Sequence, residues 1–95
     1  MNRIEHYRAV IESILGRPIG NSRKRDDVAA RMCLAYQLHA DGYTSGQIGK
    51  MIGRDHATVL HMIKMMEACK AYPRAYRREC DLWEEFEELL NYNDK

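Results

Sequence analysis

One glycine, Gly53, constrains the fold more than any other residue because it separates two helical patterns of unequal length. Before it, Thr44-Ser-Gly-Gln47 fits a capping box, in which the threonine and glutamine side chains bond each other's backbone N–H groups. After it, Asp55 is a favourable N-cap for a helix that we expect to run to about Lys70. A short helix, a glycine turn and a longer helix are typical of a helix-turn-helix, whose second helix can enter a DNA major groove.

The rest of the chain is also helical in pattern, and no segment shows the apolar–polar alternation of a strand. Its 95 residues suffice for one core, so we expect one all-α, small multi-helix domain over residues 1–95. The expected helices span about 2–15, 26–40, 44–52, 55–70 and 74–90. This domain divides into a basic loop (17–25), a helix-turn-helix (44–70) and an acidic C-terminal helix (74–90).

Apolar side chains at helical spacing predict the core. The segment 26–40 is apolar on most sides, which is typical of a central, buried helix. The segment 55–70 is apolar on one side, and Ala57, His61 and Lys64 fall on the opposite side, which we expect to face solvent. The predicted core positions are Ile4, Tyr7, Ile11, Ile14, Val28, Met32, Leu34, Ala35, Tyr36, Leu38, Ile48, Met51, Ile52, Val59, Met62, Ile63, Met66, Leu82, Trp83, Phe86, Leu89 and Leu90.

The charges are divided unevenly along the chain. Residues 1–78 hold 14 Lys/Arg and 7 Asp/Glu, a net +7, whereas residues 79–95 hold 1 Lys and 7 Asp/Glu, a net −6. The total of +1 conceals this division. A basic body with an acidic tail can bind an anionic partner through one face while its other end is repelled.

Several protein classes are not expected. No run approaches the roughly 20 apolar residues of a membrane span, and the N-terminal residues lack the apolar core of a signal peptide. Cys33, Cys69 and Cys80 are odd in number and widely spaced, which argues against a disulfide framework. We therefore expect a cytoplasmic protein that is not associated with a membrane.

Two groups of residues are candidates for contact with DNA. The first lies at the expected recognition helix, where histidine, threonine and lysine can bond base edges or phosphates and an alanine can touch a thymine methyl. The second is a basic cluster, which can span phosphates or reach a narrow minor groove; its alternative is an ordinary solvated loop. The first group is Arg54, Asp55, His56, Ala57, Thr58, His61 and Lys64; the second is Arg23, Lys24 and Arg25, with Arg31 following.

Catalytic and metal sites are weaker candidates. The spacing His56-x4-His61 is close to that of zinc ligands, but no paired cysteines accompany it. No histidine stands where it would activate a cysteine, and there is no Walker nucleotide loop. We expect no enzyme activity, no catalytic residues, no metal and no cofactor.

The segment from Ile48 to His61 reads Ile-Gly-Lys-Met-Ile-Gly-Arg-Asp-His-Ala-Thr-Val-Leu-His, and it resembles the signature of the C-terminal DNA-binding domain (domain IV) of the bacterial replication initiator DnaA. The resemblance in element order covers roughly residues 2–70. It implies a Trp-repressor-like fold, with the helix from Asp55 in the major groove of a short asymmetric box and Arg25 or a neighbour in the minor groove. By motif position it also implies that Arg31, Arg54 and the residues from Asp55 to Thr58 lie at the DNA.

The chain departs from this family at three positions: Ala57 replaces a hydroxyl residue, one glycine precedes Arg54 instead of two, and Met32 replaces a glutamine. These changes bear on box specificity. The family's ATPase module is absent from the sequence, so we expect a regulator of replication initiation encoded by a bacterium, a phage or a mobile element. Double-stranded DNA is the expected partner, and a replication protein is a second candidate. The alternative function is a protein-interaction domain that keeps the fold and has lost DNA reading.

Overall fold

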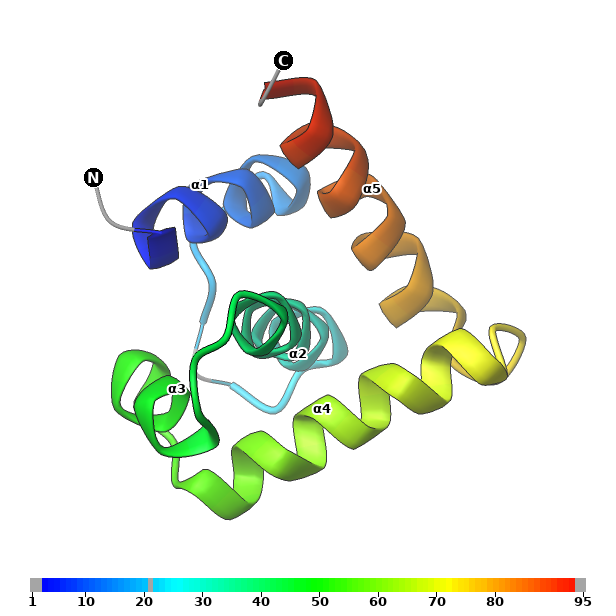
Figure 1. Ribbon diagram of the computed structural model, residues 1–95. Coiled ribbons are helices and arrows are strands. Elements are labelled where there is room, and N and C mark those ends of the chain that lie inside the picture. Colours follow the sequence, from blue (N-terminus) through cyan, green and yellow to red (C-terminus); the bar gives the residue numbers. More distant parts are fainter. Residues whose placement is uncertain (1–2, 21, 94–95) are drawn as a thin grey trace.

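A computed structural model describes residues 3–20 and 22–93, with side chains as far as residue 91. Five helices follow one another: α1 (Arg3–Leu15), α2 (Arg25–Ala40), α3 (Ser45–Ile52), α4 (His56–Ala71) and α5 (Arg77–Asn93). The described residues contain no strand, so the all-α prediction is confirmed. Figure 1 looks along α2, which lies at the centre with the other helices around it.

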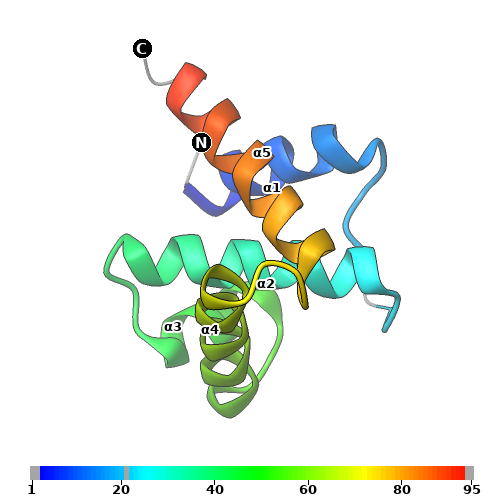
Figure 2. The ribbon, with the colours of Figure 1, turned by 90° about the vertical axis from the view of Figure 1, so that its right-hand side faces the viewer.

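The centre of the core is α2, as its apolar composition predicted. Its buried apolar residues lie on every side of the helix, which explains the absence of a single apolar stripe. Figure 2 shows α2 lying across the view while α4 is seen nearly end-on, so these two helices cross at a steep angle. The residues of α2 in this core are Ala29, Ala30, Met32, Cys33, Leu34, Ala35 and Leu38.

The terminal helices α1 and α5 pack on each other and on α2. Their contact includes an edge-to-face pair of Tyr7 and Phe86, with ring centroids 5.9 Å apart. Two expectations are corrected here. In α1, Val10 is buried, whereas Ile4 and Ile14 only flank the core. In α5, Leu89 is 37% exposed, because the helix turns this position away from α2.

The boundaries of α2 and α5 also differ from the prediction. The helix α2 begins at Arg25, one residue before the expected start, and α5 begins at Arg77 and not at Arg74. Residues 73–76 form a turn, in which the amide of Ala75 donates to the carbonyl of Tyr72. Pro73 at the start of this turn has no N–H to continue α4.

The connection from α3 to α4 follows the predicted pattern. The capping box of Thr44 and Gln47 is present, and Gly53 ends α3 in the left-handed region at φ 74°. The amide of Arg54 then donates to the carbonyl of Gly49 over 2.9 Å. A Cβ atom on Gly49 would lie 2.4 Å from the carbonyl oxygen of Arg54, so only glycine permits this close approach of α3 to the turn.

None of the described helices is long and apolar enough to span a membrane. All three cysteines are free thiols near the junction of α2, α4 and α5. The thiol of Cys80 donates to the carbonyl of Cys69. Burial raises the pKa of Cys69 to about 12, so its thiol is protonated at neutral pH and is a poor nucleophile.

Candidate nucleic-acid interface

The first turn of α4 is fixed by its N-cap. The carboxylate of Asp55 accepts from the backbone N–H of Thr58 over 3.0 Å, as the sequence predicted. Bonds from the side chain and backbone of Thr58 lower the pKa of Asp55, so it stays ionised at neutral pH. This cap holds the residues that follow in helical geometry from the first turn onward.

One face of α4 points to solvent. Ala57, His61 and Lys64 are exposed, as predicted; His56 is exposed too, and Thr58 is half-buried. The opposite face enters the core through Val59, Met62, Ile63 and Met66, which confirms the predicted helical phase. Leu60 belongs to the same outward face, with 44% of its surface exposed. The sequence reasoning missed it, although its spacing of three from Ala57 and four from Lys64 could have placed it there.

The turn before α4 carries Arg54, which is half-buried and donates to the carbonyl of Gly53 over 3.2 Å. Arg54 also lies close enough to Arg31 of α2 for their charges to interact. Burial and, after it, the charge of Arg54 lower the pKa of Arg31. The turn and α2 therefore bring two positive charges together from distant parts of the chain.

The basic loop (residues 17–25) presents Arg23 and Lys24 as exposed side chains. Its last residue, Arg25, is exposed too but belongs to the first turn of α2. The described loop residues have few backbone bonds of their own. Side chains from α1 and α2 hold them instead, including Glu12, whose carboxylate accepts from the amide of Ile19 over 2.7 Å.

The structure corrects the placement of Arg31. This side chain is not on the surface: Arg31 is only 7% exposed, and its guanidinium donates to the carbonyls of Gly20 (2.7 Å) and Ser22 (2.9 Å). The loop carbonyls accept from Nη1 and Nη2, whereas the buried Nε of Arg31 has no hydrogen-bond partner among the described residues. Arg31 thus supports the loop from beneath, and its direct contact with DNA stays a prediction.

A second buried charge, Asp27, lies one turn earlier in α2, and the sequence reasoning missed its role. Its carboxylate accepts from Arg17 over 2.7 Å, from the amide of Gly20 over 3.1 Å, and from the hydroxyl of Ser22. These bonds, led by that of Ser22, hold the pKa of Asp27 well below its usual range. Its spacing of four from Arg31 would have put both on one helix face.

The start of α5 reaches back to the start of α2. Arg25 pairs with Glu79, and Arg78 pairs with Asp26 over 2.8 Å. The remaining acidic residues of α5 point to solvent, and both views place α5 across α2 from the α3–α4 turn. The exposed row consists of Asp81, Glu84, Glu85, Glu87 and Glu88.

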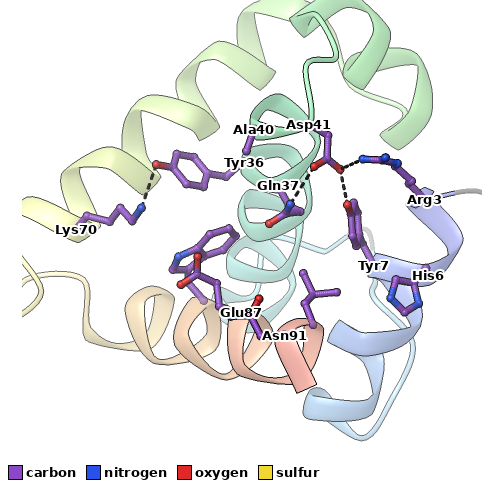
Figure 3. Close-up of a pocket in the computed structure, with 12 residues that line it drawn as sticks. Arg3, His6, Tyr7, Tyr36, Gln37, Ala40, Asp41, Lys70, Glu87 and Asn91 are labelled. Atoms are coloured by element: carbon purple, nitrogen blue, oxygen red, sulfur yellow. Dashed lines mark hydrogen bonds and ion pairs between the residues drawn. The ribbon is translucent and has the colours of Figure 1, made fainter. Parts of the chain in front are cut away.

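A cavity of about 830 Å³ opens between α1, α5 and the C-terminal ends of α2 and α4. Figure 3 shows Asp41 at its edge, accepting from Arg3, Tyr7 and Gln37, and Lys70 beside the ring of Tyr36. Its charged lining contains two cations, Arg3 and Lys70, and two carboxylates, Asp41 and Glu87. None of the predicted DNA-contacting residues lines this cavity.

Within residues 3–20 and 22–93, no group of three or more His, Cys, Asp or Glu side chains is arranged to hold a metal ion. His56 and His61 both lie on the exposed face of α4. The two histidines are therefore available at the surface for contact with a partner.

The chain is 39% identical over 63 residues to the chromosomal replication initiator protein DnaA of Bacteroides fragilis (strain YCH46). This match covers 63% of the chain and 13% of the initiator, so the chain spans about an eighth of that relative's length. No model of a protein family matches the chain, and no solved structure matches it significantly. The similarity supports the relation to DnaA that the motif predicted; the assignment to domain IV stays a prediction.

Proposed function

We propose that this protein binds double-stranded DNA with a preference for a short DnaA-type box, in replication initiation or its regulation. The observation that carries the proposal is the exposed first turn of α4, capped by Asp55 and preceded by the glycine turn. Its similarity to part of DnaA supports the same conclusion. In this proposal α3 and α4 form a helix-turn-helix within a Trp-repressor-like fold.

Each element of the interface has a distinct role in this proposal. His56, Ala57 and Thr58 enter the major groove and meet base edges, with Ala57 offering a methyl group in place of a hydroxyl. His61 and Lys64 lie one to two turns further along the exposed face and meet phosphates. Arg23, Lys24 and Arg25 follow the phosphate backbone or the adjacent minor groove.

The protein acts by binding alone in this proposal, as a cytoplasmic regulator without enzyme activity, metal or cofactor. The raised pKa values of its three thiols support this reading, because protonated thiols are poor nucleophiles and poor metal ligands. A replication protein is a further proposed partner.

Fluorescence anisotropy on two labelled duplexes tests the proposal. One duplex carries a DnaA-type box and the other a scrambled sequence, each at low and moderate salt. We expect tighter binding to the box and a steep loss of affinity as salt rises, because bound phosphates release their counterions. Equal binding to both duplexes would remove the sequence preference, and no binding at low salt would remove the DNA function.

A protein-interaction role is the second candidate, and the exposed acidic row of α5 favours it. That row offers five exposed carboxylates to a basic partner. The duplex-binding experiment separates the two functions. A chain that binds no duplex at low salt but associates with a replication protein would support the protein-interaction role.

A further inference from the structure

The basic loop is held by two buried residues of opposite charge that stand one helical turn apart. Asp27 is 3% exposed and Arg31 is 7% exposed, and both lie on the face of α2 that the loop crosses. Isolated buried charges are costly, so each needs partners that remain in place. Here the partners are the backbone and side chains of the loop itself.

The bonding pattern is reciprocal at two loop positions. Gly20 donates its amide to Asp27 and offers its carbonyl to Arg31. Ser22 donates its hydroxyl to Asp27 and offers its carbonyl to Arg31. Each position is thus fixed through both a donor and an acceptor, immediately before the exposed Arg23 and Lys24.

Two further contacts extend this arrangement. The backbone amide of Lys24 donates to the hydroxyl oxygen of Ser22 over 3.2 Å. Because Ser22 is itself bonded to Asp27, this bond also restricts the position of the Lys24 backbone. A Cβ atom on Gly20 would lie 2.8 Å from a carboxylate oxygen of Asp27, so a side chain at this position would displace the carboxylate. Gly20 and the Asp27 carboxylate are therefore closely packed, so the position of the loop depends on that of the carboxylate.

We infer that Asp27 is a positioning residue for DNA recognition, which orders the basic loop so that Arg23 and Lys24 meet the phosphate backbone in a fixed register. This inference rests on the proposed function, since it concerns how the loop cations reach DNA. It differs from that function because Asp27 itself touches no DNA. A negative charge at the interface thereby favours the binding of a polyanion.

The adjacent residue provides a matched control. Asp26→Asn and Asp27→Asn each remove one negative charge from neighbouring positions, but the carboxylate of Asp26 accepts from Arg78 of α5, whereas that of Asp27 accepts from the loop. If only the net charge mattered, both variants would bind a duplex as tightly as the parent or more tightly. If Asp27 orders the loop, Asp27→Asn should bind roughly tenfold more weakly, because a disordered loop must be ordered on binding. Asp26→Asn should then show no weakening.

A double-mutant cycle separates positioning from a general structural effect. In a chain that already carries Arg23→Ala and Lys24→Ala, adding Asp27→Asn should change affinity by less than about twofold, because the cations it positions are gone. The inference is overturned if Asp27→Asn weakens binding equally in both backgrounds, or does not weaken it in the parent. Should Asp27→Asn fail to fold, Ser22→Ala removes one bond to the same carboxylate and is subject to the same outcomes.

Amide hydrogen exchange gives a readout that does not depend on DNA. The Gly20 amide should be protected in the parent and in Asp26→Asn, and should exchange faster by roughly an order of magnitude in Asp27→Asn. A parent chain that binds no duplex would refute the proposed function and leave this comparison intact. Unchanged protection at Gly20 would overturn the role of Asp27 in ordering the loop.

Discussion

Arg25 at the start of α2 and Glu79 at the start of α5 form a two-point ion pair, with Nε to Oε1 and Nη2 to Oε2 both at 3.3 Å. Glu79 is largely covered, whereas the Arg25 side chain is 62% exposed. The acidic end of the chain therefore binds one of the cations that we expect to meet DNA. A carboxylate in this position competes with a phosphate for the same guanidinium.

Removing this competitor should strengthen DNA binding. We expect Glu79→Gln to tighten duplex binding by less than about fivefold, since an exposed ion pair contributes little in water. Anisotropy at low salt measures the change. Glu88→Gln is the control, because it removes the same charge from an exposed position further along α5. An equal gain in both variants would assign the effect to net charge.

Removing Arg25 itself should have the opposite effect. Arg25→Ala is expected to weaken binding to all duplexes and to lower the slope of log affinity against log salt by about one, because one phosphate contact is lost. Arg8→Ala, on the exposed side of α1, removes the same charge from elsewhere. An unchanged slope in Arg25→Ala would show that this side chain stays with Glu79 in the complex.

The first turn of α4 should carry the sequence preference. We expect His56→Ala to lose discrimination between a DnaA-type box and a scrambled duplex by roughly 1–3 kcal/mol, the usual value of a specific base contact. Competition binding with both duplexes measures this difference. His39→Ala alters an exposed histidine near the end of α2 and should leave discrimination intact. Equal weakening on both duplexes would make His56 a phosphate contact.

The phase of α4 can be tested by two adjacent substitutions. Val59 is fully buried and Leu60 is 44% exposed, so the same charge placed at each meets opposite surroundings. We expect Val59→Asp to abolish cooperative unfolding, because burying an unpaired carboxylate costs roughly several kcal/mol. Leu60→Asp should melt close to the parent temperature. Circular dichroism during heating distinguishes them, and a cooperative melt of Val59→Asp would contradict this phase.

Stability should also depend on acid through Asp27. The folded protein keeps this carboxylate ionised at a lower pH than the unfolded chain does, because Ser22, Arg17 and Gly20 lower its pKa. Its contribution to the free energy of unfolding is therefore complete above the unfolded pKa of about 3.9, and is lost as the pH falls through the lower folded value. Urea unfolding at a series of acidic pH values measures this loss.

Asp27→Asn should flatten the acid dependence in that range, because no carboxylate remains to be protonated at this position. Asp81→Asn, on the exposed row of α5, is the control and should retain the parent's dependence. If Asp27→Asn loses stability with acid as steeply as the parent does, other carboxylates are responsible. The pKa of Asp55 and of Asp26 is also lowered, by Thr58 and by Arg78 respectively.

Local features of the fold were predictable from the sequence. Three such features are the capping box at Thr44, the cap at Asp55 and the left-handed Gly53. Each depends on a few neighbouring residues, so it can be predicted from the local sequence. The apolar phase of α4 follows from helical spacing for the same reason. By contrast, the exposure of Leu89 depends on how α5 rotates against α2, which no local pattern determines.

The support of the candidate site was not predictable in the same way. A cluster of Arg and Lys residues predicts an exposed basic patch, but Arg31 is buried because loop carbonyls and α2 surround it. The pairing of Arg25 with Glu79 joins residues 54 positions apart. Such contacts depend on tertiary packing, whereas residue type and spacing describe only one helix at a time.

The arrangement of charge also affects how this molecule meets a partner. The helix α5, which carries the outward carboxylates, and the α3–α4 turn, which carries Arg54, lie on opposite sides of α2, so we expect the charges to form an electric dipole. A polyanion exerts a torque on such a dipole and rotates the cationic side towards itself before contact. A larger fraction of collisions then occurs in a productive orientation. Because salt screens this orienting field, ionic strength affects the rate of association as well as the stability of the complex.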